Sequence, residues 1–177
     1  AQENDLSLDL SGYEKLMAAQ RANAKKESKF VALLPAAIDL DDETKFVGYE
    51  DSSTESEIKL IFKDGEEVKS ASEGECMIVL DSTPFYGESG GQVGDKGKLS
   101  AKGLEIEVLD TQKVGNFHLH ISKIKKGSIN LNDRVKAEIN TERRRAIVSN
   151  HSATHLMHSA LRNILGEHVQ QKGSLVN

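Results

Sequence analysis

The fold is decided by residues 104–124, LEIEVLDTQKVGNFHLHISKI. Apolar and polar residues alternate with a period of two on both sides of Val114-Gly115-Asn116, which is typical of two antiparallel strands joined by a tight turn. The same alternation recurs along the chain, and we predict strands over 44–50, 57–63, 75–82, 97–101, 104–114, 117–124 and 134–140. Six or seven short strands at this spacing indicate a small, mostly antiparallel β-barrel or a sandwich.

Two histidines lie in the strand predicted over 117–124. His118 and His120 share one face of this strand, because the side chains of alternate residues point the same way. We expect this to be a polar outer face rather than a pair of ligands. Cys76, in the strand over 75–82, is expected to be a small buried apolar residue.

Helical patterns flank the predicted strands. Ser11-Gly12-Tyr13-Glu14 has the form of a capping box and predicts a helix over about 12–28. A longer helix is predicted over about 142–165, capped by Asn140 or Thr141. The fold class is therefore α+β. We expect three regions: a helical linker region over 1–40, a β-barrel domain over 41–140, and a region opening with the long helix over 141–177.

Composition excludes several classes of protein. No apolar run approaches the ~20 residues that span a bilayer, and the first residues lack a signal-peptide pattern. The formal net charge of −5 argues against a basic DNA-binding surface, although a local basic patch suffices for RNA. The single cysteine cannot form an internal disulfide, which fits a cytoplasmic protein. The chain starts in an unpatterned acidic stretch and stops as an apolar run begins, so we expect a piece of a longer protein.

A glycine-rich segment follows the third predicted strand. Residues 85–97 read FYGESGGQVGDKG, and Gly90, Gly91 and Gln92 lie at its centre. Repeated glycines allow positive φ angles and close approach to a partner. The segment lacks the G-x-x-x-x-G-K-[ST] pattern of a phosphate-binding loop. An elaborate hairpin loop would explain it, but so much glycine and polar chemistry favours a functional loop.

Three consecutive arginines, Arg143, Arg144 and Arg145, begin the helix predicted over 142–165. Positive charge in a first turn opposes the helix dipole. A sequence accepts this conflict either because carboxylates lie nearby or because the helix meets an anionic partner such as RNA. The pattern leaves both explanations open.

His151 and His155 lie four residues apart in the same predicted helix. At this spacing two imidazoles lie one above the other on one face and can reach a single metal ion. A polar helix face that happens to carry imidazoles would have the same pattern.

Together these motifs resemble the alanyl-tRNA synthetase family. The matching residues are Phe85-Tyr86-x-Glu88-Ser89-Gly90-Gly91-Gln92-x-Gly94-Asp95-x-Gly97, Asn150-His151-Ser152-Ala153-Thr154-His155-Leu156 and Leu161-Arg162-x-x-Leu165-Gly166-x-His168-Val169-x-Gln171-Lys172-Gly173-Ser174-Leu175. The motifs are long, ordered and correctly spaced. The resemblance covers roughly residues 10–177 and an internal part of such an enzyme.

The resemblance implies a function. The parent enzyme charges tRNA(Ala) with alanine, using ATP and magnesium in a class II catalytic domain that this chain does not contain. Its editing domain hydrolyses mischarged Ser- or Gly-tRNA(Ala). In that family His151 and His155 match two zinc ligands, and a Cys-x-x-x-His farther along supplies the other pair. Thr154 and Gln171 match positions of the editing pocket, and the glycine-rich loop lies near it.

The zinc site is only half present in this sequence, because no Cys-x-x-x-His follows His155. A structural zinc site needs four protein ligands and a catalytic one usually three. We therefore expect the isolated chain to bind zinc weakly and not to deacylate tRNA. Two other functions fit the residues: a free-standing alanyl-tRNA editing hydrolase, and a non-catalytic RNA-binding module. The helix predicted over 12–28 favours the synthetase over the free-standing hydrolase.

Overall fold

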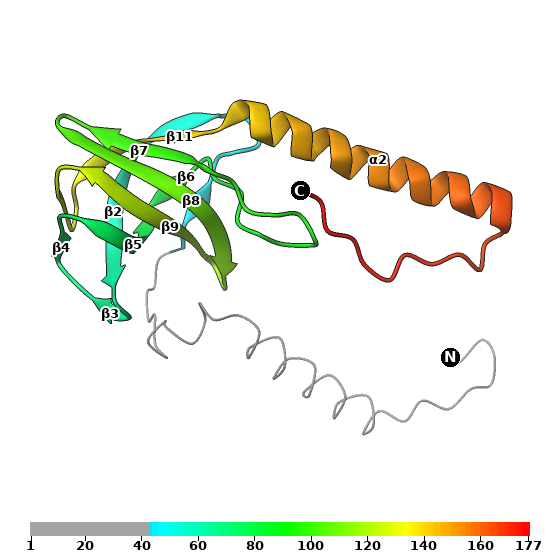
Figure 1. The fold of residues 1–177 in the computed structure, drawn as a ribbon, viewed down its shortest axis with the longest axis horizontal. Coiled ribbons are helices and arrows are strands. Elements are labelled where there is room, and N and C mark those ends of the chain that lie inside the picture. Colours follow the sequence, from blue (N-terminus) through cyan, green and yellow to red (C-terminus); the bar gives the residue numbers. More distant parts are fainter. Residues whose placement is uncertain (1–42) are drawn as a thin grey trace, which may run out of the picture. The chain divides into compact units, whose positions relative to one another are not determined.

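A computed structural model describes residues 43–177 of this chain. The described residues belong to one compact unit, Leu40–Asn177 (Figure 1). The helix predicted over 12–28 and the linker region over 1–40 lie outside the described residues.

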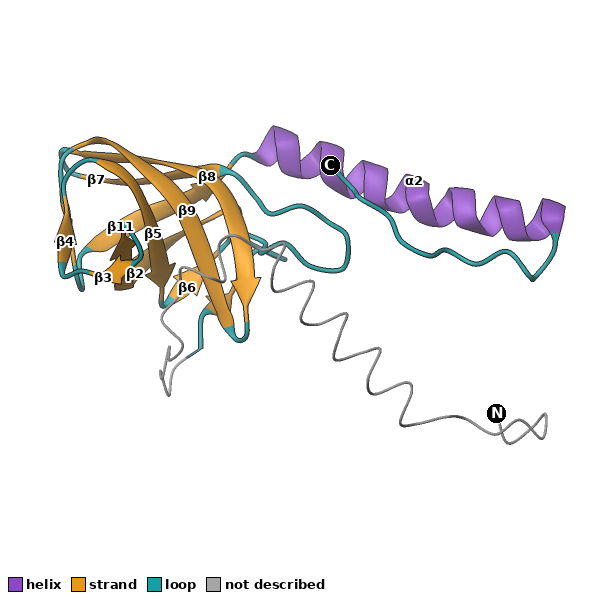
Figure 2. Ribbon diagram, turned by 60° about the horizontal axis from the view of Figure 1, so that its bottom comes forward, coloured by secondary structure: helices purple, strands orange, loops and turns teal. Residues whose placement is uncertain are grey.

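The described strands build one closed barrel and two small ribbons. Their bounds are β1 (Lys45–Phe46), β2 (Ser53–Lys63), β3 (Glu66–Glu67), β4 (Ser70–Ala71), β5 (Gly74–Leu80), β6 (Ser82–Thr83), β7 (Gly97–Ala101), β8 (Leu104–Val114), β9 (Phe117–Lys126), β10 (Ile129–Asn130) and β11 (Arg134–Ile139). The barrel order is β11-β7-β8-β9-β5-β2, with β3 paired to the end of β2 (Figure 2). Its neighbours are all antiparallel. The predicted mostly antiparallel barrel is confirmed.

The last strand, β11, closes the barrel by pairing on both of its edges. Ala137 lies opposite Leu99 of β7 on one side and opposite Thr54 of β2 on the other. The hairpin of β8 and β9 pairs Val114 with Phe117 across a two-residue turn. Gly115 has a φ of 59° there, a conformation that glycine adopts without a steric penalty.

Aliphatic side chains from every barrel strand fill the interior. The buried cluster comprises Ile58, Ile61, Ala71, Cys76, Ile78, Leu80, Phe85, Leu99, Leu104, Ile106, Val108, Ile124, Ile129, Val135 and Ala137. Cys76 is a member, as predicted, and burial raises the pKa of its thiol to about 11. The thiol therefore stays protonated at neutral pH and acts as a small apolar group.

The prediction for His118 and His120 was wrong, because both are buried. His120 is completely buried and lies between the Thr83 hydroxyl, 2.8 Å from Nε2, and the Ile78 carbonyl oxygen, 2.9 Å from Nδ1. His118 Nδ1 lies 2.8 Å from the carbonyl oxygen of Phe85. Burial lowers the pKa of both imidazoles, that of His120 to about 4, so they serve as neutral structural groups.

Several elements differ from the predicted bounds. The strand predicted over 44–50 is limited to β1, which pairs in parallel with β6, and β2 begins at Ser53, four residues before the predicted start. β4 and β10 form a second small ribbon that was not predicted. These ribbons are two residues long, too short for a periodic pattern.

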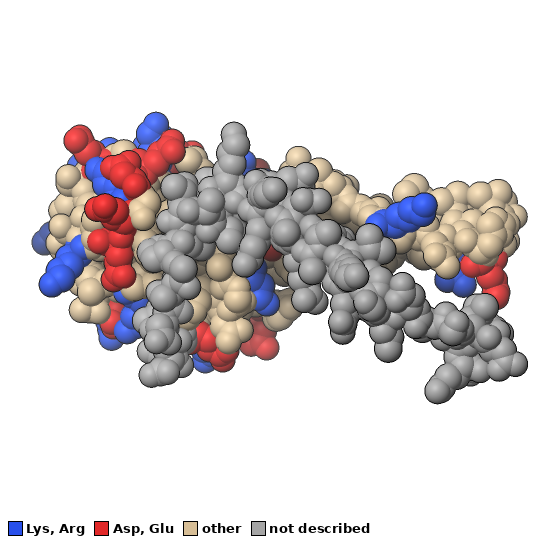
Figure 3. Space-filling model, turned by 90° about the horizontal axis from the view of Figure 1, so that it is seen from below, with Lys and Arg blue, Asp and Glu red and all other residues tan. Residues whose placement is uncertain are grey.

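One long helix, α2 (Thr141–Leu165), follows the barrel after a single residue. Asn140 is the N-cap: its side-chain oxygen accepts a hydrogen bond from the backbone N–H of Arg143, and Gly166 ends the helix. Residues 146–161 include no Asp, Glu, Lys or Arg, and charged side chains are sparse along the far half of α2 compared with the barrel (Figure 3). Within residues 43–177, no helix has the length and apolar character needed to cross a membrane.

Candidate metal centre at the junction of α2 and the glycine-rich loop

The two histidines of the H-x-x-x-H motif converge on one point. His151 Nε2 and His155 Nε2 are 3.0 Å apart, and the two rings are tilted by 32°. Two imidazole nitrogens bound to one tetrahedral zinc ion, each at ~2.0–2.1 Å, lie about 3.3 Å apart. The type and spacing of the two nitrogens therefore fit zinc. Among the described residues, no group of three or more His, Cys, Asp or Glu side chains could hold a metal ion.

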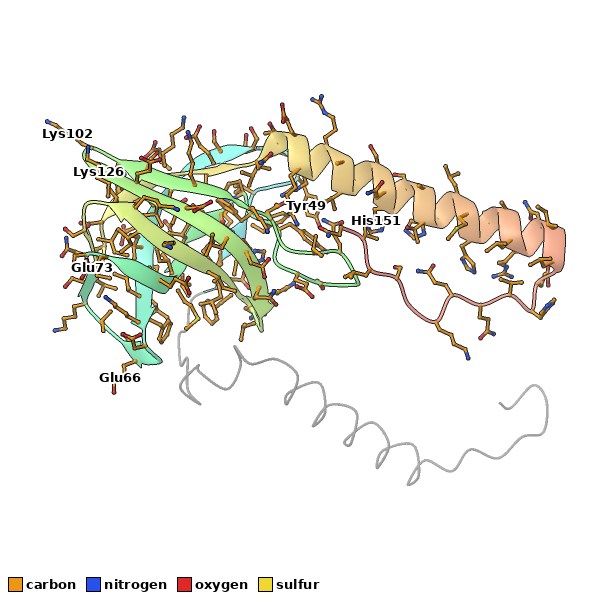
Figure 4. All side chains as sticks on the ribbon, in the orientation of Figure 1. Tyr49, Glu66, Glu73, Lys102, Lys126 and His151 are labelled. Atoms are coloured by element: carbon orange, nitrogen blue, oxygen red, sulfur yellow. The ribbon has the colours of Figure 1, made fainter. Side chains whose placement is uncertain are left out.

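Gln92 brings the glycine-rich loop to this pair. Its side-chain oxygen lies 3.0 Å from His151 Nδ1, on the side of the ring away from His155. His151 projects from α2 toward the loop and the C-terminal segment (Figure 4). Neither composition nor spacing indicated this contact, which joins residues 59 positions apart.

The C-terminal segment runs beside the glycine-rich loop as a short bridge. The Val176 N–H donates to the Gly91 carbonyl oxygen at 2.8 Å, and the Val93 N–H donates to the Val176 carbonyl oxygen at 3.1 Å. Gly91 has a φ of 84°, and a Cβ atom there would lie 2.3 Å from the Ser174 carbonyl oxygen. Glycine at this position therefore permits both the backbone conformation and the approach of the segment.

Asp95 at the end of the loop binds the first turn of α2. Its carboxylate is almost fully buried, accepts the Tyr86 N–H at 2.7 Å, and forms a bidentate ion pair with the Arg144 guanidinium. Arg144 also donates to the carbonyl oxygens of Gly48 and Pro84. A neighbouring carboxylate therefore accounts for Arg144 in this turn.

The other two arginines have different surroundings. Arg143 donates to the Gly94 carbonyl oxygen at 2.8 Å and to the Asn177 side chain at 3.3 Å. Arg145 is exposed and lines a shallow hollow of about 250 Å³ with Tyr49, an exposed aromatic residue.

The predicted pocket residues lie on the same helix and on the segment after it. The Thr154 hydroxyl donates to the Asn150 carbonyl oxygen at 2.9 Å, one turn back along α2, and its side chain is half-buried. Gln171 is exposed, and within residues 43–177 it makes no hydrogen bond to either histidine. Hydrogen bonds thus join Gln92 of the loop to His151 and His151 to His155.

A third imidazole lies on this stretch of α2. His158 is half-buried, and its Nε2 is the one buried side-chain nitrogen or oxygen in the described part of the chain with no hydrogen-bond partner. An unsatisfied buried polar atom is uncommon in folded proteins. Its position three residues after His155 was visible in the sequence, but its burial was not.

Comparison with known proteins identifies relatives of almost the whole chain. A family model described as tRNA synthetases class II (A) matches residues 1–143. The alanine–tRNA ligases of Idiomarina loihiensis and Hydrogenovibrio crunogenus are 48% and 49% identical over 177 residues, which is 99% of this chain and 20% of each relative. That of Shewanella loihica is 47% identical over 175 residues. The chain spans about a fifth of the length of these curated relatives.

Proposed function

The chain belongs to the tRNA synthetases class II (A) family, and we propose that it works as part of an alanine–tRNA ligase that joins alanine to tRNA(Ala) with ATP. ATP and magnesium act in a catalytic domain outside these 177 residues. The barrel precedes the editing domain, which hydrolyses mischarged tRNA, and residues 141–177 open the core of that domain. We place the protein in the cytoplasm, where a single free cysteine is ordinary.

The editing proposal is carried by the convergence of His151 Nε2 and His155 Nε2 at 3.0 Å. We propose that these two nitrogens hold zinc together with ligands from the chain beyond Asn177. Zinc supplies a Lewis acid that polarises an ester carbonyl or lowers the pKa of a bound water. The described residues hold and orient the two imidazoles.

A second hydrolytic site is needed because alanine is small. A pocket that accepts alanine cannot exclude glycine by size, and it rejects a single added hydroxyl only weakly. Thr154, one residue before His155, uses its hydroxyl proton in the bond to Asn150 and keeps oxygen lone pairs to accept a hydrogen bond. We propose that it accepts from the serine hydroxyl of a mischarged tRNA, and that Gln171 lines the same pocket.

For tRNA contact we favour Arg145 among the three arginines. Arg143 and Arg144 use their guanidinium groups in bonds to the barrel and the loop, whereas Arg145 is exposed. A contact with phosphate predicts that Arg145→Ala weakens binding and reduces the slope of log affinity against log salt by about one. An unchanged slope would contradict the contact.

The function is tested in the full alanine–tRNA ligase that contains this chain. We expect His151→Ala to lower deacylation of Ser-tRNA(Ala) by at least the roughly 10–100-fold that loss of a ligand's hydrogen-bond partner costs, because it removes a ligand itself. The rate of alanine charging should stay unchanged because ATP chemistry occurs elsewhere. The control is Ser152→Ala, an exposed neighbour whose hydroxyl bonds only within α2. Full deacylation by the His151 variant would refute the editing role.

A further inference from the structure

We infer that Gln92 is a positioning residue that fixes the tautomer of His151 and leaves its Nε2 lone pair available for the metal ion that the histidine pair would hold. This inference rests on the proposed function, because it concerns the same histidine pair. The glycine-rich loop would then orient His151 for metal binding, in addition to lying near the site.

The hydrogen bond between Gln92 and His151 has a direction. The side-chain oxygen of Gln92 can only accept, so a hydrogen bond across its 3.0 Å contact with His151 Nδ1 assigns the proton to Nδ1. A neutral imidazole with a proton on Nδ1 has its lone pair on Nε2. In the metal-free chain His151 Nε2 then accepts from His155 Nε2 across their 3.0 Å contact. For both Nε2 atoms to bind a metal ion, the proton of His155 would have to move to its Nδ1, whereas His151 already has its Nε2 lone pair available.

Gln92 is held in place by its backbone, and the residue is 9% exposed. Its N–H donates to the Ser89 carbonyl oxygen at 3.0 Å, and its own carbonyl oxygen accepts the Ser89 N–H at 3.2 Å. The flanking residues Gly91 and Val93 are bonded to Val176 on the neighbouring segment. Backbone hydrogen bonds before and after Gln92 therefore fix the position of its side-chain amide.

A second contact joins the glycine-rich loop to α2. Asp95, three residues after Gln92, binds Arg144, which lies seven residues, about two helical turns, before His151. Two contacts two turns apart set both the rotation and the axial position of α2 relative to the loop. The fixed position of α2 against the loop therefore places His151 next to Gln92.

The tautomer is measured by nitrogen-15 NMR of the histidine rings in the 177-residue chain, after chelation of metal with EDTA. We expect His151 to carry its proton on Nδ1 in the wild type and in Gln92→Glu, whose carboxylate also accepts. In Gln92→Met, which has a similar length and no acceptor, we expect a mixture of tautomers. Gln112→Met is the matched control, because Gln112 bonds to the same loop through Glu88 and does not contact His151.

Zinc affinity is measured on the full ligase by competition with a chelator. Groups that hydrogen-bond to the other ring nitrogen of a ligating histidine typically contribute 10–100-fold to metal affinity, so Gln92→Met should lose about that factor, while Gln92→Glu and Gln112→Met should not. An Nε2–H tautomer in the wild type would overturn the role of Gln92, as would unchanged tautomer and affinity in Gln92→Met or an equal loss in Gln92→Glu. Failure of the wild-type ligase to bind zinc would overturn the proposed function, and the tautomer would then decide the role of Gln92 alone.

Discussion

Replacing Arg144 by methionine should destabilise the chain far more than the same replacement at Arg145. Arg144 is 17% exposed in its side chain and donates to the Asp95 carboxylate and to the carbonyl oxygens of Gly48 and Pro84. Without it the Asp95 carboxylate, 2% exposed, keeps the Tyr86 N–H as its remaining hydrogen-bond donor. Breaking a buried ion pair on one side typically costs about 3–5 kcal/mol.

The measurement is equilibrium unfolding in urea at pH 7, followed by circular dichroism. Arg145→Met changes an exposed neighbour in the same helical turn, so its free energy of unfolding should stay within about 0.5 kcal/mol of the wild type. In a double-mutant cycle with Asp95→Asn, the second change should add much less than it does alone, since the buried charge has already gone. A loss below about 1 kcal/mol for Arg144→Met would refute the view that this pair secures α2 to the loop.

Three further results are expected. Burial lowers the pKa of His120 to about 4, so the unfolded chain binds more protons than the folded chain between about pH 4 and 6.5. The free energy of unfolding should therefore fall by about 3 kcal/mol as the pH falls through that window. Urea titrations at several pH values should show this dependence on pH, and His120→Gln should reduce it. Cys76 should react with a thiol reagent only at the rate of unfolding, because it is buried and its pKa is raised to about 11; fast labelling of the native chain would count against this. Gly91→Ala should expose the Val176 amide to hydrogen exchange, whereas Gly90→Ala, which also has a positive φ but open space at Cβ, should leave it protected.

The barrel was predictable because its strands are long enough to show a period of two. The hairpin over 104–124 has the predicted start and turn in the structure, and α2 begins within one residue of its expected start. Alternation could not show that both faces of β9 are covered. The sequence therefore predicted that His118 and His120 lie on the surface, whereas β9 has buried side chains on both faces.

The candidate site was predictable where it is local in sequence. His151 and His155 are four residues apart, and helical geometry alone brings them together. The contacts that orient them are not local: Gln92 lies 59 residues from His151, and Arg144 lies 49 residues from Asp95. Such pairings depend on how a closed barrel places its loop against the following helix. The only hint of the Arg144–Asp95 pair in the sequence was the run of three arginines in the first turn of α2, where positive charge opposes the helix dipole. That run was equally compatible with a nearby carboxylate and with an RNA partner.

β11 closes the barrel by pairing on both of its edges, and it is the last barrel strand to leave the ribosome. The barrel therefore cannot close until late in synthesis. β2 and β7 have no closing partner until residues 134–139 have been made, 71 or more residues after Lys63 ends β2. At about 5–20 residues per second this delay lasts roughly 4–14 s. β2 presents an unpaired edge throughout that interval, and β7 does so from Ala101 onward, 33 residues before Arg134. An unpaired strand edge can pair with another chain, so aggregation is a risk at this stage. Once β11 is in place, those edges are paired and the same contact sets α2 in position after a single residue.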